Sequence, residues 1–203
     1  NVMLSHKKSL NILKKTNALL EGHFVLSSGL HSPKYIQCAK LLSFPYIADK
    51  ICHSLAKKIK KNFKSIDLIL APAMGGVIIG YEIGRLLKKE TVFCERVNGK
   101  FILRRGFHIK KGSKVIIIED VITTGKSSLE CEKLIKKFGG KLIGFASIIN
   151  RSTKRSLKIK KKIISHMKIE VPTYKSNQLP ESLKLTPITV PGSRFIKWKK
   201  DSV

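Results

Sequence analysis

The fold is decided by the stretch Val115-Ile116-Ile117-Ile118-Glu119-Asp120-Val121-Ile122-Thr123-Thr124-Gly125-Lys126-Ser127-Ser128. Residues 114–118 are almost all β-branched, which predicts a buried strand. Two acids follow, then two threonines and a glycine before an amphipathic helix expected over 127–138. At the carboxyl end of a parallel strand such acids face the ligand crevice of the sheet.

The chemistry of this stretch suits a phosphorylated sugar. Ionised Glu119 and Asp120 can accept hydrogen bonds from two neighbouring ribose hydroxyls. The turn over 123–127 directs backbone N–H groups and hydroxyls toward one point. The start of the following helix adds partial positive charge, so a phosphate dianion fits there. We therefore predict a ribose-phosphate site over Glu119–Ser127.

Two other interpretations of the stretch have to be weighed. One is a purely structural strand, turn and helix in which Ser127 is the N-cap. The other is a nucleotide-binding Walker A loop, whose end Gly125-Lys126-Ser127 resembles. That motif needs a glycine five residues before Gly125, where Asp120 stands, so we exclude a nucleoside triphosphatase.

Strands and helices alternate on both sides of this stretch. We expect strands over 67–71, 91–95 and 141–150, and helices over 77–88 and from Pro45 onward. A helix over 3–21, ended by Gly22, and short strands and turns over 24–38 precede them. The alternation predicts an α/β fold with a doubly wound parallel sheet and helices on both faces. Residues after 168 lose the alternation and are expected to cover the edge or mouth of the sheet.

Length and cysteine usage suit one intracellular domain. The chain has 203 residues, 42% of them hydrophobic, which is enough for a single core without covalent staples. Its four cysteines form no CxxC pair, so we expect free, mostly buried thiols in a reducing compartment. The start of the chain has no apolar segment typical of a signal peptide, and the apolar runs are short. These features predict a cytoplasmic protein that does not enter a membrane.

The charge is strongly positive, with 41 Lys and Arg against 13 Asp and Glu, a net +28. Such a charge is typical of nucleic-acid binding. The lysines, however, are spread over nearly every segment and are not interleaved with aromatic residues that could stack on bases. We therefore disfavour nucleic acid as the main partner and expect the field to attract small polyanionic substrates.

The whole 115–128 stretch resembles the phosphoribosyl pyrophosphate (PRPP) motif of type I phosphoribosyltransferases. Three further segments resemble the orotate branch of that family. Residues 24–33 resemble its amino-terminal hood, 71–76 its pyrophosphate loop, and 191–194 a tail found in one bacterial subgroup. The resemblance implies a parallel sheet flanked by helices with a small hood from the N-terminal segment. It implies one domain over 1–203, with a hood at about 20–40, a core at about 45–168 and a C-terminal cover over 169–203.

The resemblance also implies an activity. Members transfer the 5-phosphoribosyl group from PRPP to orotate and release orotidine 5'-monophosphate and pyrophosphate, in de novo pyrimidine biosynthesis. The PRPP-binding positions that it implies are Glu119, Asp120, Val121, Ile122, Thr123, Thr124, Gly125, Lys126 and Ser127, together with Arg96 and Lys100. The catalytic positions are Arg96, Lys100 and Asp120. Arg96 and Lys100 lie on an expected mobile loop over 96–108 that reaches the neighbouring subunit, which implies a homodimer with shared active sites.

The base and the pyrophosphate have implied partners too. Thr123 and Arg151 match orotate-binding positions, and an arginine can bond a carboxylate bidentately. The pyrophosphate loop is Ala73, Met74, Gly75 and Gly76. Mg²⁺ is the implied cofactor. It is expected on PRPP oxygens with no direct protein ligand, as suits an ion that keeps waters and binds substrate phosphates.

Three cations common in the family are absent, because Ser27, Gly75 and Val97 stand where a lysine is frequent. Arg104 or Arg105 could compensate, and glycine N–H groups can still meet phosphate oxygens. Two rival functions stay open. A purine phosphoribosyltransferase is disfavoured by Arg151 and the hood, since a purine has no carboxylate. A non-catalytic, PRPP-sensing nucleic-acid regulator is disfavoured by Lys100 in its glycine-flanked loop.

Overall fold

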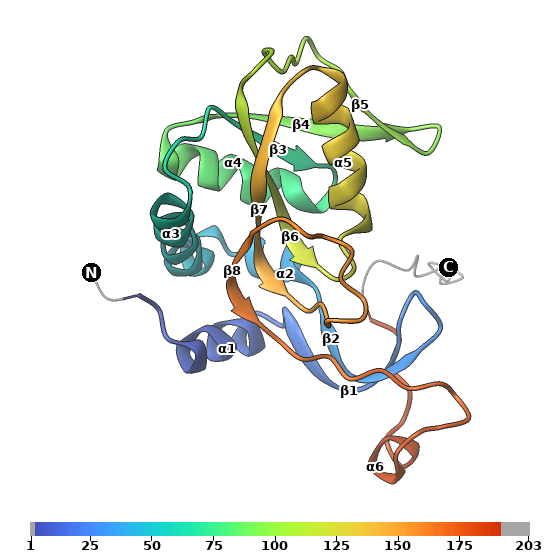
Figure 1. Ribbon diagram of the computed structural model, residues 1–203. Helices are drawn as coiled ribbons and strands as arrows, with labels where there is room; N and C mark the ends of the chain where they lie inside the picture. Colours follow the sequence, from blue (N-terminus) through green and yellow to red (C-terminus); the bar gives the residue numbers. More distant parts are fainter. Residues whose placement is uncertain (1–2, 192–203) are drawn as a thin grey trace, which may run out of the picture.

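The computed structural model describes residues 3–191, and the sequence segment over 191–194 therefore lies, except for Pro191, outside the described residues. The centre of the fold is a six-stranded sheet with the strand order β5-β4-β3-β6-β7-β8 (Figure 1). The strands are β3 (Leu68–Pro72), β4 (Glu90–Val97), β5 (Lys100–Leu103), β6 (Lys114–Ile122), β7 (Lys141–Asn150) and β8 (Ile163–Lys168). All neighbours pair in parallel except β5, which is antiparallel to β4. The predicted α/β class is confirmed.

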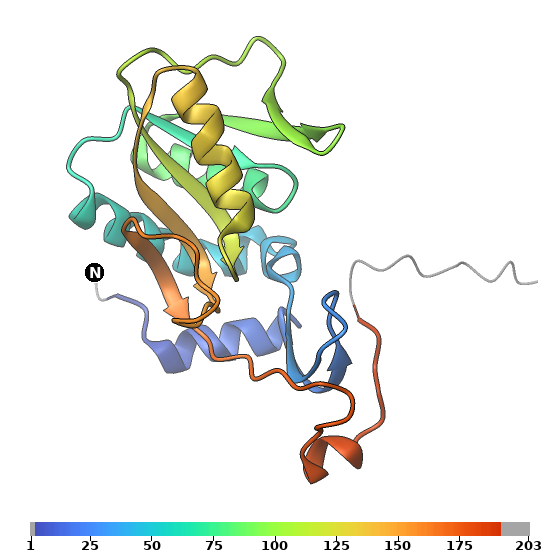
Figure 2. The ribbon, with the colours of Figure 1, turned by 45° about the vertical axis from the view of Figure 1, so that its right-hand side comes forward.

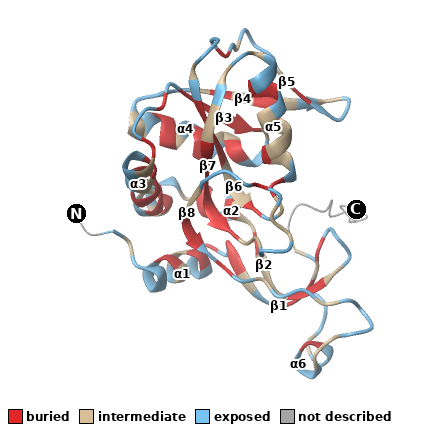
Figure 3. Ribbon diagram, viewed as in Figure 1, coloured by how far each residue is buried: buried red, intermediate tan, exposed pale blue. Residues whose placement is uncertain are grey.

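The apolar run of β6 is buried on both faces of the sheet. Ile116 and Ile118 belong to one core cluster, and Val115 and Ile117 belong to the other. This alternation is expected of a strand, whose successive side chains point to opposite faces. Figure 3 shows the resulting buried layer along the middle of the sheet.

Helices cover both faces, as the alternating pattern predicted. The first cluster is closed by α1 (His6–Lys15), α2 (Cys38–Leu42), α3 (Pro45–Asn62) and α4 (Gly75–Leu87), and the second by α5 (Lys126–Lys137). Pro45 occupies the first turn of α3, as expected. None of the helices within residues 3–191 is long and apolar enough to span a membrane.

The predicted helix over 3–21 was wrong at its end. Helix α1 ends at Lys15, capped by Thr16, and Asn17 has a positive φ of 59°. Leu19 then starts a strand and is 4% exposed. Tertiary pairing explains the difference, because Leu19 pairs with Ile36 across a two-stranded sheet. Leu20, which has helical spacing with Leu10 and Leu13 in the sequence, lies in this strand instead.

That small sheet consists of β1 (Leu19–Val25) and β2 (His31–Ile36) and is separate from the central one (Figure 2). Chain 169–191, which includes α6 (Glu181–Lys184), runs along it. The backbones of His31 and Tyr174 exchange two hydrogen bonds of 2.8 Å. The His23 carbonyl accepts a third, 2.8 Å long, from the N–H of Thr189. The described part of the C-terminal segment is thus anchored on the β1–β2 sheet, the segment that was expected to form the hood.

Candidate active site

The two acids at the end of β6 point to opposite faces of the sheet. Glu119 continues the face of Val115 and Ile117, and its Oε1 accepts a 3.0 Å hydrogen bond from Ser128 of α5. Asp120 continues the other face and lies against α4. A Cβ added to Gly75 would come within 2.7 Å of Asp120 Oδ1, so a side chain at this position would require the carboxylate to move.

Burial shapes the electrostatics of both carboxyls. It raises the pKa of Glu119 to about 7, an effect that Asp120 increases and that Ser128 and Arg96 oppose. Burial also raises the pKa of Asp120, partly offset by the N–H of Val121, which donates to Oδ1 over 2.8 Å. A carboxyl pair held partly desolvated in a crevice is a common mark of a functional site. An approaching cation or hydroxyl donor would favour the charged forms.

The turn after the acids leads directly into α5. Gly125, with a φ of 81°, is the N-cap, so the interpretation of Ser127 as the N-cap was wrong. Gly125 offers no capping side chain, and the first turn of α5 holds no acidic residue. The helix start therefore presents amide N–H groups and positive potential that an anion can complement. Thr123 and Lys126 are exposed at this point.

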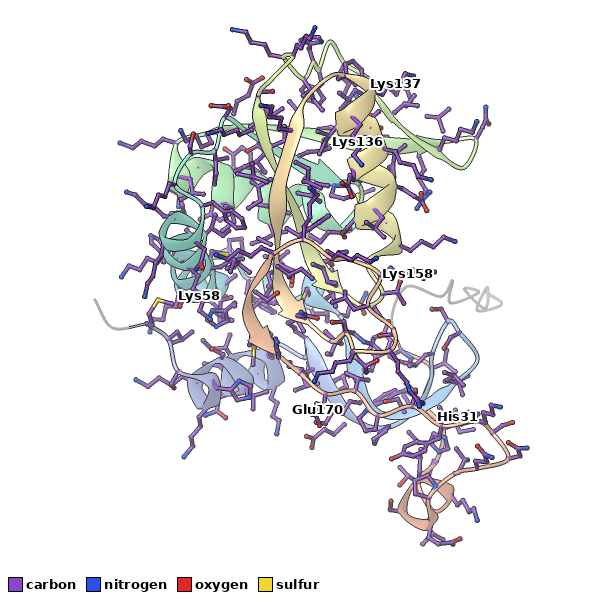
Figure 4. All side chains as sticks on the ribbon, viewed as in Figure 1. His31, Lys58, Lys136, Lys137, Lys158 and Glu170 are labelled. Atoms are coloured by element: carbon purple, nitrogen blue, oxygen red, sulfur yellow. The ribbon has the colours of Figure 1, made fainter. Side chains whose placement is uncertain are left out.

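A basic loop packs against this turn. The N–H of Lys158 donates to the carbonyl of Thr124 over 2.9 Å. A Cβ on Gly125 would lie 2.5 Å from two side-chain carbons of Ile159, so glycine is required for this contact as well as for the left-handed φ. Figure 4 shows Lys158 beside the start of α5. Residues 151–162 contain seven Lys or Arg and no acid, which places positive charge next to the predicted phosphate position.

The segment over 73–76, predicted as the pyrophosphate loop, joins β3 to α4 beside Asp120. The Ala73–Met74 peptide bond is cis, and the N–H of Ala73 donates to the carbonyl of Cys94 over 2.8 Å. Gly76 approaches β6 closely, since an added Cβ would lie 2.7 Å from the carbonyl oxygen of Ile118. The start of α4 and the end of β6 are thus in direct contact.

Arg151 follows β7, the strand next to β6. Its N–H donates to the carbonyl of Ile122 over 2.9 Å, which fixes its backbone beside the acid-bearing strand. Its Nε is buried and has no hydrogen-bond partner within residues 3–191. Burial lowers the pKa of Arg151, and the phenol of Tyr35 on β2 partly opposes this. An unpaired, buried guanidinium nitrogen at this position suits an anionic ligand.

The loop predicted over 96–108 contains a β-hairpin. Strands β4 and β5 meet through Asn98 and Gly99, whose φ values of 51° and 76° are typical of a tight hairpin turn. Arg96 lies over the ring of Phe101 and contacts α5, with 2.6 Å from its Nη1 to Glu130 Oε2 and 3.5 Å from its Nη2 to Ser127 Oγ. The structure thus brings Arg96 to the phosphate turn.

Lys100 lies apart from the acid pair in the sheet, because β4 and β3 stand between β5 and the acid-bearing strand β6. It is exposed at the start of β5, on a hairpin that projects beyond the sheet edge in Figure 1. Arg105, one of the two arginines expected to compensate for missing cations, pairs with Glu95 through two 3.1 Å hydrogen bonds. That pairing occupies its guanidinium.

Sequence reasoning missed three residues of the site. Ser128 bonds Glu119, Tyr35 from the hood lies near Arg151, and Glu130 holds Arg96. Each is positioned by packing between elements that are distant in sequence. Only Ser128 had a local signal, because it immediately follows the phosphate turn at the start of a helix.

Comparison with known proteins agrees with this geometry. The model of the phosphoribosyl transferase domain family matches residues 40–181. A curated orotate phosphoribosyltransferase from Parvibaculum lavamentivorans is 43% identical, covering 95% of this chain and 100% of that protein. A curated orotate phosphoribosyltransferase from Erythrobacter litoralis is 41% identical, covering 94% of this chain and 99% of that protein.

Solved structures share the fold. The crystal structure of orotate phosphoribosyltransferase from Aeropyrum pernix superposes with a TM-score of 0.64 at 21% identity, over 78% of this chain and 92% of that one. A crystal structure of adenine phosphoribosyltransferase superposes with a TM-score of 0.63 at 18% identity, over 77% of this chain and 99% of that one. At these identities the similarity establishes the fold, but it does not establish which base the enzyme uses as a substrate.

The fold and the acid-turn-helix site define a transferase of the phosphoribosyltransferase class. Given the full-length relatives, the chain belongs to the orotate phosphoribosyltransferase family.

Proposed function

We propose that this chain catalyses transfer of the 5-phosphoribosyl group of PRPP to orotate at the site formed by β6, the turn over 123–125 and Arg151. The observation that carries the choice of base is the buried, unpaired Nε of Arg151 beside the acid-bearing strand. Orotate carries a carboxylate that can pair with it, whereas purine bases carry none. Relatives of nearly the same length bear the name of this activity.

Positioning and charge neutralisation would drive the reaction. Glu119 and Asp120 accept the ribose hydroxyls, and the start of α5 with Thr123–Ser127 holds the 5'-phosphate. The orotate nitrogen gives up its proton to solvent and bonds to C1 as the C1–pyrophosphate bond breaks, so positive charge builds on the sugar and negative charge on the leaving group. Backbone N–H groups at the start of α4 and the cations of the hairpin neutralise the pyrophosphate. Fixed dipoles of this kind contribute most where water is excluded.

Magnesium fits this site as a substrate-borne ion. Residues 3–191 place no group of three or more His, Cys, Asp or Glu side chains together as a metal cage. PRPP itself offers hydroxyl and pyrophosphate oxygens, the donors that Mg²⁺ prefers. When bound, the ion would neutralise part of the pyrophosphate charge.

A homodimer is proposed from two observations. Lys100 lies on β5, which β4 and β3 separate from the acid-bearing strand β6 of the same chain. On the α3 and α4 side, a groove of about 580 Å³ is bordered by exposed apolar side chains, with Tyr46 75%, Tyr81 69% and Ile78 57% accessible. Exposed apolar groups gathered around a groove are typical of an interaction surface. A second copy of the chain would cover them and bring its own hairpin.

We place the protein in the cytoplasm. All four cysteines are buried, and Cys94 Sγ lies 3.4 Å from Cys131 Sγ. A chain of this length with few cysteines and no CxxC pair suits a reducing compartment.

Spectrophotometric measurement of orotate loss tests the proposed function. We expect absorbance loss that depends on both PRPP and Mg²⁺, with no product when adenine or hypoxanthine replaces orotate. Turnover of a purine instead would contradict the choice of base. Tight PRPP binding without turnover of any base would favour the regulatory alternative.

Arg151→Ala should raise the KM for orotate far more than the KM for PRPP. The reason is the loss of a charge-assisted hydrogen bond to the carboxylate, which costs about 1.5–3 kcal/mol. Steady-state kinetics with each substrate varied measures the two effects. Arg155→Ala, which removes an exposed cation of the same loop, is the control and should leave the KM for orotate unchanged. Equal effects of Arg151→Ala on both substrates would show that Arg151 does not bind the base.

A further inference from the structure

A buried serine sits behind the acid pair, outside the positions expected to touch substrate. Ser128 is 1% exposed and lies on the first turn of α5, with its side chain turned toward the sheet. Its Oγ donates to Glu119 Oε1 over 3.0 Å. A carboxylate oxygen accepts this bond best when it is charged, and the bond also fixes the carboxylate plane.

We propose that Ser128 is a positioning residue that keeps Glu119 ionised and oriented for the ribose hydroxyls of PRPP. The inference rests on the ribose-binding role of Glu119 given above. Ser128 itself is enclosed between α5 and β6 and acts only through Glu119.

Several features around Glu119 disfavour its charged form, which the hydrogen bond from Ser128 stabilises. Asp120 beside it on β6 and burial both disfavour its charge, and the thiol of Cys131 from α5 is a further neighbour. Arg96 from β4 favours the charge, but its guanidinium is already bound by Glu130. Together these groups leave the pKa of Glu119 at about 7. Within residues 3–191, Ser128 is the neutral donor that is hydrogen-bonded to this carboxylate.

The direction of the pH effect depends on which protonation state of Glu119 binds PRPP. A protonated Glu119 offers one acceptor fewer to the ribose, so PRPP affinity should fall as the pH drops through about 7. Removing the hydroxyl of Ser128 removes a donor to the charged form. The midpoint of Glu119 should therefore move upward, by about one pH unit.

The test is Ser128→Ala, with PRPP and Mg²⁺ binding measured by calorimetry from pH 6 to pH 9. Dividing the dissociation constant of the variant by that of the wild type removes the titration of PRPP itself. We expect this ratio to be roughly five at pH 7 and close to one at pH 9, because both proteins are ionised there. Ser54→Ala is the matched control. It removes another buried serine hydroxyl, one that accepts from the N–H of Leu4 on the α3 side, and should give a ratio near one at every pH.

Two further measurements separate the inference from the proposed function. Carbon-13 NMR of labelled glutamate side chains, assigned with Glu119→Gln, reads the Glu119 titration directly. In the Glu119→Gln background, adding Ser128→Ala should have no pH-dependent effect.

An unchanged Glu119 midpoint in Ser128→Ala would overturn the inference, as would an affinity loss that is the same at all pH values. A shifted midpoint with unaltered PRPP affinity would leave Ser128 acting on Glu119 and would instead contradict the ribose-binding role of Glu119.

Discussion

Asp120→Asn should lower kcat/KM for PRPP by about 10²-fold, the cost of losing charge-assisted bonds to the ribose. The substitution keeps the shape of the side chain and an oxygen that can accept from the N–H of Val121. It removes the negative charge that balances the sugar as the pyrophosphate leaves. The measurement is steady-state kinetics with PRPP varied at saturating orotate.

The fold should survive this substitution. Burial raises the pKa of Asp120, which means that its charge costs stability above the pKa of the unfolded chain. A neutral asparagine removes that cost, so the thermal midpoint should stay level or rise. Asp67→Asn is the control, because Asp67 accepts from the N–H of Lys114 at the opposite end of β6. Near-wild-type turnover of Asp120→Asn, with Asp67→Asn also active, would contradict ribose binding by Asp120.

Lys100→Ala should lower kcat by about 10²-fold. This is the usual cost of removing one group that stabilises the negative charge developing in the transition state. PRPP binding in the ground state should change less, since Thr123–Ser127 still hold the 5'-phosphate. Lys133→Ala is a suitable control. It removes an exposed lysine of α5 that lines a surface pocket together with Lys100, and it should leave kcat unchanged.

Mixing Lys100→Ala subunits with Asp120→Asn subunits tests whether the hairpin acts across a dimer. If each site combines its own Asp120 with the partner subunit's Lys100, one site of a heterodimer carries both lesions and the other carries none. Activity should then recover to about half of the wild-type value per heterodimer. Two affinity tags can isolate the heterodimer. No recovery in the isolated heterodimer would mean that the hairpin closes over its own subunit or that Lys100 is an ordinary surface lysine.

The fold was predictable where pattern and packing agree. The run over 114–118 is apolar at every position but the first, so both faces of that strand had to be buried, and the alternation around it required a parallel sheet. Strand β7 begins and ends at the predicted residues. The prediction failed at the end of α1, because Leu20 continues the helical spacing of Leu10 and Leu13 but pairs with Tyr35 of β2 instead. Strand β8 was not predicted, because its sequence follows a run of lysines and has no clear signal of its own.

By itself the sequence predicted which residues form the candidate site, because the order of acids, hydroxyls, glycine and helix is local. It placed the start of the following helix at Ser127, one residue later than Lys126, where α5 begins after its N-cap Gly125.

Only the tertiary structure decided how these groups are arranged. The alternation of β6 sends Glu119 toward Ser128 and Asp120 toward Gly75, but the identity of those neighbours depends on how α5 and α4 pack on the sheet. The position of Arg96, which is bound to Glu130, also depends on packing. So does that of Lys100, whose strand β5 is separated from β6 by β4 and β3. Contacts between elements far apart in sequence arise from packing geometry, and a linear pattern of residue types does not contain that geometry.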